Sequence, residues 1–131
     1  AKSIIIEREK KVIKTTTELA DIVKKINSYS HKNPSTRVFQ ALRIFVNDEL
    51  NSLEIFLRNC LKFLNKKSKI IIVAFHSLED RIVKNFFKKN SSKLKIITKK
   101  PITPTKSEIR KNPRSRSAKL RVAEVLWDIF F

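Results

Sequence analysis

A short polar run follows the most apolar stretch of the sequence. Residues 70–75 are six consecutive apolar residues, and five of the next six side chains can donate, accept or carry charge: His76, Ser77, Glu79, Asp80 and Arg81. In an open α/β sheet, ligands bind at the carboxyl ends of the strands. If residues 70–75 form such a strand, the polar run lies where a catalytic pocket is expected. The candidate pocket residues are His76, Glu79, Asp80 and Arg81.

Helix capping is a second explanation for part of this run. Ser77 as N-cap, with Asp80 three residues later, would satisfy free backbone amides at the start of a helix. Glu79 and Asp80 also suit the positive end of the helix dipole. Capping does not account for His76 or Arg81, for which a site role and a structural role both remain open.

A polar stripe lies on a helix predicted to begin at Asn33-Pro34, with Asn33 as its cap and Pro34 in its first position. The stripe members are spaced by four, three and four residues, so they share one helix face: Thr36, Gln40, Arg43 and Asn47. A solvated face usually carries Lys and Glu, whereas this stripe has directional hydrogen-bonding groups and one cation. Gln40, Arg43 and Asn47 are therefore candidates for the wall of a substrate-binding site, the alternative being a solvated face.

The third candidate region is basic. Residues 93–121 hold eleven Lys and Arg residues and one acid, Glu108. Guanidinium and hydroxyl groups are typical phosphate contacts. The region is therefore interpreted as a nucleic-acid contact, or alternatively as a solvated charge run. Its contact candidates are Arg114, Arg116, Lys119 and Arg121, interleaved with Ser115 and Ser117.

The composition narrows the class of partner. The 131-residue chain carries 30 Lys and Arg against 12 Asp and Glu, a net charge of +18, which favours nucleic acid over an anionic membrane surface. The longest apolar run is far shorter than the roughly 20 residues of a membrane span. The single cysteine, Cys60, suits a reducing cytosol. No Cys/His cluster has metal-ligand spacing, so no metal is expected.

Two residue types are missing. The chain has no glycine, where average usage predicts roughly nine, and no methionine. A glycine-rich dinucleotide fingerprint and a P-loop are therefore excluded within these residues. We expect the chain to be a piece of a longer protein.

Hydrophobic periodicity predicts an α/β arrangement that ends in an antiparallel strand pair. Residues 70–75 are expected to be a central parallel strand covered on both faces. The other expected elements are a short helix over 2–13, a helix capped by Thr15 and Glu18, one long helix over 34–64, a helix over 78–89, strands over 93–98 and 118–125, and a proline-containing loop between those two strands.

Three stretches resemble motifs of a known family. They read NPSTRVFQALRIFVNDEL from Asn33, FHSLEDRIVKNFF from Phe75 and KPITPTKSEIRKNPRSRSAKLRVAE from Lys100. The chain resembles, over nearly its whole length, the C-terminal part of the bacterial 16S ribosomal RNA (cytosine-N4)-methyltransferases, the RsmH or MraW family. It departs from the family at Asn33, where a His is usual, and at Lys67 and Ser68, where the family has two glycines.

The resemblance implies a class I, Rossmann-like methyltransferase fold with S-adenosylmethionine as methyl donor. The implied substrate is a decoding-centre cytidine of 16S rRNA, and the implied location is the cytoplasm. Residues 1–33 are then the end of an inserted helical domain, and residues 34–131 are the closing half of the methyltransferase domain. The family's cofactor loops have no counterpart in this sequence, so no cofactor-binding residue is assigned and the chain alone is expected not to bind the cofactor.

Methylation of the cytosine N4 needs acceptors for the amino group and a path for its proton. Glu79, Asp80 or Asn47 are candidate acceptors, His76 is a candidate proton relay, and Arg43 and Arg81 are candidates for a phosphate or the methionine carboxylate. The sequence does not choose among these roles. A non-catalytic basic fragment that binds rRNA, or the product of a decayed gene, is the alternative to an enzyme.

Overall fold

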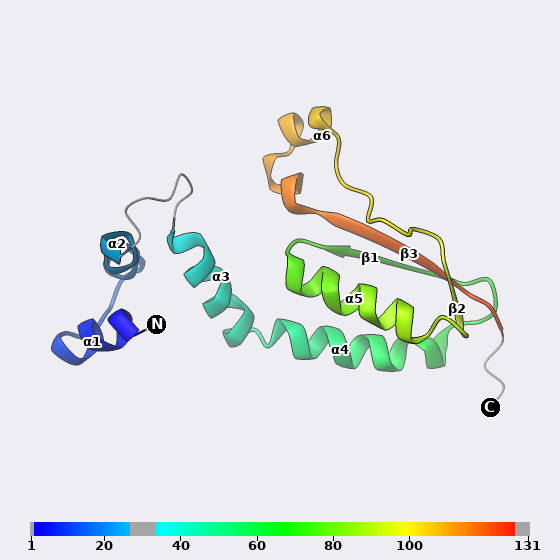
Figure 1. Ribbon diagram of the computed structural model, residues 1–131, viewed down its shortest axis with the longest axis horizontal. Coiled ribbons are helices and arrows are strands. Elements are labelled where there is room, and N and C mark those ends of the chain that lie inside the picture. Colours follow the sequence, from blue (N-terminus) through cyan, green and yellow to red (C-terminus); the bar gives the residue numbers. More distant parts are fainter. Residues whose placement is uncertain (1, 27–33, 128–131) are drawn as a thin grey trace. The chain divides into compact units, whose positions relative to one another are not determined.

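The computed structural model describes residues 2–26 and 34–127, and the chain divides into two compact units, Ala1–Glu49 and Leu50–Phe131. The first unit contains three helices in the described residues: α1 (Lys2–Lys10), α2 (Thr16–Ile26) and α3 (Ser35–Val46) (Figure 1). Helix α2 packs against both α1 and α3. The first unit is therefore helical throughout its described elements.

The predicted capping box at the start of α2 is confirmed. The Glu18 amide donates to Thr15 Oγ1 at 3.2 Å, and Glu18 Oε2 accepts from the Thr15 amide at 3.0 Å. Glu18 Oε2 also accepts from the Lys14 amide at 2.8 Å. These backbone hydrogen bonds, that of Lys14 first, lower the pKa of Glu18 from 4.5 to about 2.

The prediction of one long helix over 34–64 is wrong. Helix α3 ends at Val46, and α4 (Glu49–Cys60) begins after Asp48, whose φ of 49° lies in the left-handed region. Asp is among the few non-glycine residues that tolerate this region, so the chain breaks the helix there without a glycine. A 3-10 turn, Leu61–Phe63, follows α4. Pro34 occupies the N-cap position of α3, and the predicted cap Asn33 lies outside the described residues.

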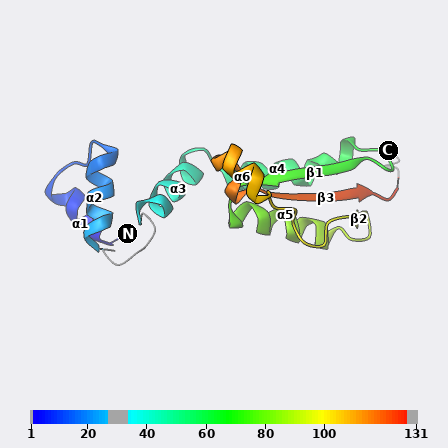
Figure 2. The same cartoon turned by 90° about the horizontal axis from the view of Figure 1, so that it is seen from above.

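The second unit is built on a three-stranded sheet with β1 (Lys69–Ala74), β2 (Leu94–Ile96) and β3 (Lys119–Val125). The strand order is β1-β3-β2, and both pairings are antiparallel (Figure 2). The predicted closing strand pair is confirmed as β2 with β3. The expectation of a parallel central strand is not met in this sheet, because β1 lies at its edge and pairs only with β3.

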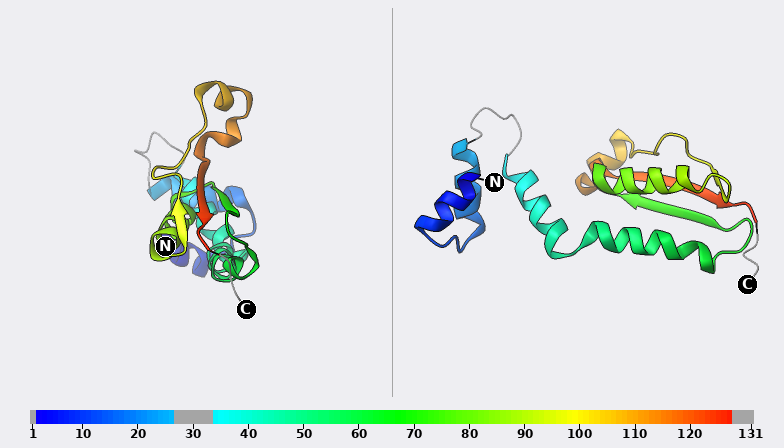
Figure 3. Two further views of the ribbon diagram at one scale, coloured as in Figure 1. Left: turned by 90° about the vertical axis from the view of Figure 1, so that its right-hand side faces the viewer. Right: turned by 60° about the horizontal axis from the view of Figure 1, so that its bottom comes forward.

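Helices α4 and α5 (Ser77–Lys89) cover one face of this sheet (Figure 3). Side chains of a strand alternate between its two faces, and Ile70 and Ala74 of β1 point to the covered face. Leu57 of α4 and Phe87 of α5, each 1 % exposed, pack into the same core. The core members are Leu57, Ile70, Val83, Phe87, Leu94, Ala123 and Val125.

The opposite face of β1 is apolar too, but the described residues leave it open. Ile71 is 58 % exposed and Val73 is 48 % exposed. A continuous apolar run is typical of a strand covered on both faces. The sequence pattern therefore predicts that both faces of β1 are buried, whereas the described residues bury only one of them.

The segment between β2 and β3 was predicted as a loop, and this is only partly right. It contains α6 (Lys106–Lys111), whose N-cap Thr105 accepts from the Glu108 amide at 3.2 Å through its hydroxyl oxygen. A 3-10 helix, Pro113–Ser117, leads into β3.

Across residues 2–26 and 34–127, none of the helices has the length and apolar character that crossing a bilayer requires.

Phe87→Ala should destabilise the second unit by about 3–5 kcal/mol, because it removes a fully buried aromatic ring from the core. Phe63→Ala is the matched control, since Phe63 is 81 % exposed, and it should change stability by no more than about 0.5 kcal/mol. Urea unfolding followed by fluorescence of Trp127, the only tryptophan, measures both changes. Equal losses in the two variants would contradict this core.

Candidate functional site

The polar run lies at the turn between β1 and α5. His76 has an extended backbone, with φ of −142° and ψ of 166°, and is the N-cap of α5. Its Nδ1 accepts from the Glu79 amide at 3.3 Å. Glu79 Oε2 in return accepts from the backbone amides of His76 at 3.3 Å and Phe75 at 2.9 Å. The imidazole and the carboxylate thus hold each other in place through the backbone.

The prediction that Ser77 is the N-cap is therefore wrong by one residue. The imidazole of His76 performs the role expected of a serine hydroxyl, and Ser77 is exposed in the first turn of α5. A structural role for His76 therefore does not exclude a role in the site. The residue caps α5 through Nδ1, and its second ring nitrogen, Nε2, still faces Glu79.

His76 and Glu79 also form an acid–base pair. His76 Nε2 lies 3.5 Å from Glu79 Oε2, and the histidine is 9 % exposed. Glu79 Oε1 makes no hydrogen bond to the residues that the structure describes, so its lone pairs remain available. Arg81, one turn further along α5, is exposed. A proton acceptor, a buried imidazole and a cation therefore lie within seven residues of the strand end.

Asp80 is held by a buried ion pair. Arg121 of β3 donates to both of its carboxylate oxygens, Nε to Oδ1 at 2.7 Å and Nη2 to Oδ2 at 3.2 Å. Lys119 Nζ lies 3.7 Å from Asp80 Oδ2. The hydrogen bond from Arg121 is the main reason why the pKa of Asp80 is lowered from 3.8, against the opposing effect of burial. Asp80 is therefore ionised, and both of its carboxylate oxygens are engaged by cations.

This pair corrects the interpretation of the basic region. Arg121 was grouped with the phosphate contacts, but it is 6 % exposed and bound to Asp80. The Ser115 hydroxyl is also used internally, because it donates to the Asn112 carbonyl at 2.8 Å. Arg114 and Arg116 are exposed, as a phosphate contact requires, and Lys119 is half-buried beside Asp80.

The polar stripe belongs to the first unit, where it is organised by an acid that sequence reasoning missed. Arg43 donates to Glu49 through Nε at 2.8 Å and Nη2 at 3.1 Å, and Asn47 Nδ2 donates to Glu49 Oε1 at 3.2 Å. Gln40 is half-buried and Thr36 is exposed. Glu49 lies six residues from Arg43, which is not a same-face spacing on a continuous helix. Only the helix break at Asp48 brings Arg43 and Glu49 together. A prediction of this ion pair from sequence would therefore have required a prediction of the break.

The whole chain has close relatives among known proteins. The model of the MraW methylase family matches residues 1–126. A protein named ribosomal RNA small subunit methyltransferase H from Hydrogenobaculum sp. is 51 % identical over 130 residues. Proteins of the same name from Trichormus variabilis and Sulfurihydrogenibium azorense are 55 % and 53 % identical over 120 and 134 residues.

These alignments cover almost all of this chain but only part of each relative. They include 98 %, 88 % and 96 % of the chain, and 44 %, 39 % and 45 % of the three relatives in the same order. The chain thus spans less than half the length of the relatives that it matches.

Asp80→Ala should cost about 3–5 kcal/mol at neutral pH, because it leaves Arg121 as an uncompensated buried charge. Glu54→Ala is the control, since its pair with Arg58 at 3.4 Å is exposed and should contribute at most about 1 kcal/mol. Because pairing lowers the pKa of Asp80 below its ordinary value of 3.8, the contribution is complete well above pH 3.8 and is lost as pH falls through the folded-state pKa. Urea unfolding at several pH values measures it. An equal loss for both variants would show that the Asp80 pair behaves like a surface pair.

His76→Ala should cost about 0.5–2 kcal/mol, because it removes the N-cap of α5. His76→Asn should recover most of this loss, since Asn is an efficient N-cap, and Ser77→Ala should have almost no effect. Thermal unfolding followed by Trp127 fluorescence compares the three variants. A larger loss for Ser77→Ala than for His76→Ala would restore Ser77 as the cap.

Proposed function

The chain belongs to the MraW methylase family, and we propose that it forms the C-terminal part of an S-adenosylmethionine-dependent methyltransferase acting on N4 of a cytidine in the decoding centre of 16S rRNA. The observation that carries this proposal is the identity of 51 % over 98 % of the chain to a protein named as a ribosomal RNA small subunit methyltransferase. The activity is proposed for the longer protein that such relatives represent.

In this proposal, residues 1–33 are the end of a helical insert and residues 34–131 complete a class I, Rossmann-like methyltransferase sheet. The exposed apolar face of β1 supports it, because Ile71 and Val73 are suited to burial rather than to water. β1 is then an interior strand of the larger sheet, and the His76 turn lies at its carboxyl end, where α/β enzymes bind ligands.

The reaction requires an acceptor for a weakly nucleophilic amine. The N4 lone pair of cytosine is delocalised into the ring, so the base is taken out of its stack and its amino group is held in line with the methyl group. We assign the acceptor to Glu79, whose Oε1 is available, rather than to Asp80, whose oxygens are occupied by Arg121 and Lys119. Asp80 then positions the turn without touching the substrate.

Glu79 is also the proposed proton acceptor, and His76 supports it. As N4 gains its methyl group it must lose one proton, which the carboxylate of Glu79 can take. Nδ1 of His76 accepts from the Glu79 amide, so the ring proton is on Nε2, 3.5 Å from Glu79 Oε2, where it stabilises the carboxylate. The imidazole is fixed by its bond to the Glu79 amide, so its ring is already oriented when the substrate arrives.

S-adenosylmethionine supplies the methyl group in the proposed reaction. Arg81 has an exposed guanidinium, which is suited to the carboxylate of the cofactor's methionine moiety. Arginine and a carboxylate commonly form a bidentate pair with two parallel hydrogen bonds. The rest of the cofactor grip is proposed to come from outside these residues, because a glycine loop of the usual kind cannot form in a chain without glycine. The 131-residue chain is therefore proposed not to bind the cofactor by itself.

The RNA contacts are proposed to come from exposed cations and amides. Arg114 and Arg116 are suited to phosphates, with a smaller role for Lys119 because Asp80 partly neutralises it. Gln40, Arg43 and Asn47 are proposed as substrate contacts, with Arg43 and Asn47 oriented by Glu49. A ribosomal substrate also implies that the enzyme works in the cytoplasm.

A chimera tests the proposal. The part of the Hydrogenobaculum protein that aligns with this chain is replaced by residues 1–131, and transfer of labelled methyl groups from S-adenosylmethionine to unmethylated small ribosomal subunits is measured. The chimera should be active. His76→Asn, which keeps the helix cap, and Arg81→Ala should each reduce turnover at least about tenfold at nearly unchanged melting temperature. Asp21→Ala, which removes an exposed pair with Lys24 of α2, is the control and should retain normal turnover.

Two outcomes contradict parts of this proposal. A folded chimera that binds small subunits without transferring methyl groups would favour the non-catalytic RNA-binding fragment. Normal turnover per folded molecule in the His76→Asn and Arg81→Ala variants would mean that the turn is only structural.

A further inference from the structure

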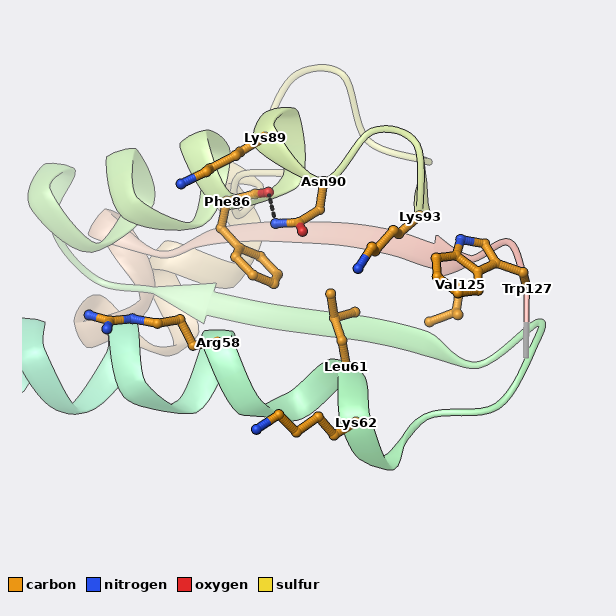
Figure 4. A pocket seen from close by; sticks show the side chains of 9 residues that line it. All are labelled: Arg58, Leu61, Lys62, Phe86, Lys89, Asn90, Lys93, Val125 and Trp127. Carbon is orange, nitrogen blue, oxygen red and sulfur yellow. Dashed lines mark hydrogen bonds between the residues drawn. The ribbon is translucent and has the colours of Figure 1, made fainter. Parts of the chain in front are cut away.

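A groove between α4 and α5 is not used by the proposed catalytic turn. One cavity of about 370 Å³ lies between the C-terminal ends of these helices and the end of β3, with Phe86, Val125 and Trp127 among its lining (Figure 4). A second hollow of about 460 Å³ continues along the helices and shares Arg58, Phe86 and Lys89 with the first. Volumes of this size suit small ligands or one or two nucleotides.

The rim of the groove is strongly basic. Its cations are Arg58, Lys62, Lys89 and Lys93. The one acid that lines either hollow is Glu54, which is paired with Arg58 at 3.4 Å. The rim therefore carries a net charge of about +3 and attracts a polyanion.

The wall of the groove is aromatic and apolar. Trp127 is 42 % exposed, and Lys93 Nζ lies 5.3 Å from the centroid of its ring, a cation–π contact. Phe86 and Leu61 complete the apolar surface, and Figure 4 shows the Phe86 ring directed into the cavity. The side-chain nitrogen of Asn90 donates to the Phe86 carbonyl at 2.9 Å, which fixes its amide beside the same space.

We propose that this groove binds nucleotides of single-stranded RNA. Exposed aromatic rings stack on bases, and surrounding Lys and Arg side chains follow the phosphates, which is the combination by which proteins bind single strands. Trp127 and Phe86 offer the stacking surfaces, and the four rim cations offer the phosphate contacts. A purely apolar peptide would leave these cations unpaired, and a purely anionic polymer would leave the aromatic wall unused.

The groove and the catalytic turn lie at opposite ends of the sheet. β3 runs antiparallel to β1, with Ala74 paired to Lys119 and Lys69 to Glu124, so Trp127 follows the strand end furthest from His76. The five residue-to-residue steps from Lys69 to Ala74, at about 3.3 Å each, separate these ends by about 17 Å. RNA in the groove is thus held away from the target base, as an anchoring contact. Trp127 lies one residue beyond the family match, which ends at residue 126.

This inference deepens the proposed function, since RNA is its substrate, but it is tested by binding and not by methyl transfer. A hexanucleotide of single-stranded RNA is titrated into the 131-residue chain while the fluorescence of Trp127, its only tryptophan, is recorded. Saturable quenching is expected. Dextran sulfate of equal charge has no bases to stack, so it should not reproduce the quenching. Equal quenching by both polymers would overturn the proposal.

Three variants separate stacking from charge. Trp127→Ala should weaken binding of the hexanucleotide about tenfold, which corresponds to about 1.4 kcal/mol, whereas Trp127→Phe should retain most of the affinity. Neutralising Lys62, Lys89 and Lys93 to Gln should reduce the slope of log K against log salt by about 2, at about 0.7 per phosphate contact. Fluorescence anisotropy of labelled RNA measures the affinity and its dependence on salt.

The matched control replaces Lys10, Lys24 and Lys25 of α1 and α2 by Gln, which removes the same charge from the first unit. This control should leave the quenching of Trp127 intact. If the groove triple and the control triple change the salt slope equally, or if Trp127→Ala binds RNA as tightly as the unmodified chain, the groove is not an RNA site. The result is independent of catalysis, so an inactive chimera that still shows quenching would count against the proposed function alone.

Discussion

The buried ion pair between Asp80 and Arg121 is the contact on which the arrangement of the second unit depends. It joins the first turn of α5 to β3 across 41 residues of sequence, with two hydrogen bonds in one fork. The cap formed by His76 and Glu79 lies in the same turn, so its position relative to the sheet follows from this pair. Because the desolvation of two charges offsets most of their attraction, the benefit of the pair is positional specificity more than stability.

Sequence patterns predicted the features that depend on neighbouring residues. The capping box of Thr15 and Glu18, the apolar strand before His76 and the closing strand pair all follow from spacing along the chain. Three features were not predictable in this way. The helix break at Asp48 depends on one backbone angle, the capping role of His76 depends on where β1 stops, and the burial of Arg121 depends on a partner far away in sequence.

The large positive charge separates in three dimensions into two groups of cations. Arg43 and Arg121 are bound to carboxylates and maintain the structure of their own units. Arg114, Arg116 and the cations on the groove rim face solvent and are available to a polyanion. A count of charges cannot distinguish these groups, because the difference lies in whether an acid is folded against the cation. The charge available to a polyanion is therefore smaller than the net charge of the protein suggests.

The open edge of β1 has a consequence for the behaviour of the chain in solution. An unpaired strand edge exposes a row of amides and carbonyls, and Ile71 and Val73 add an apolar face beside it. Lys69 offers one charge against unwanted pairing, but the five strand residues after it carry none. At high concentration such a strand is a template for intermolecular β-pairing and fibril growth. Colloidal stability of the isolated chain is thus expected to depend on its net charge, and to fall when salt screens that repulsion.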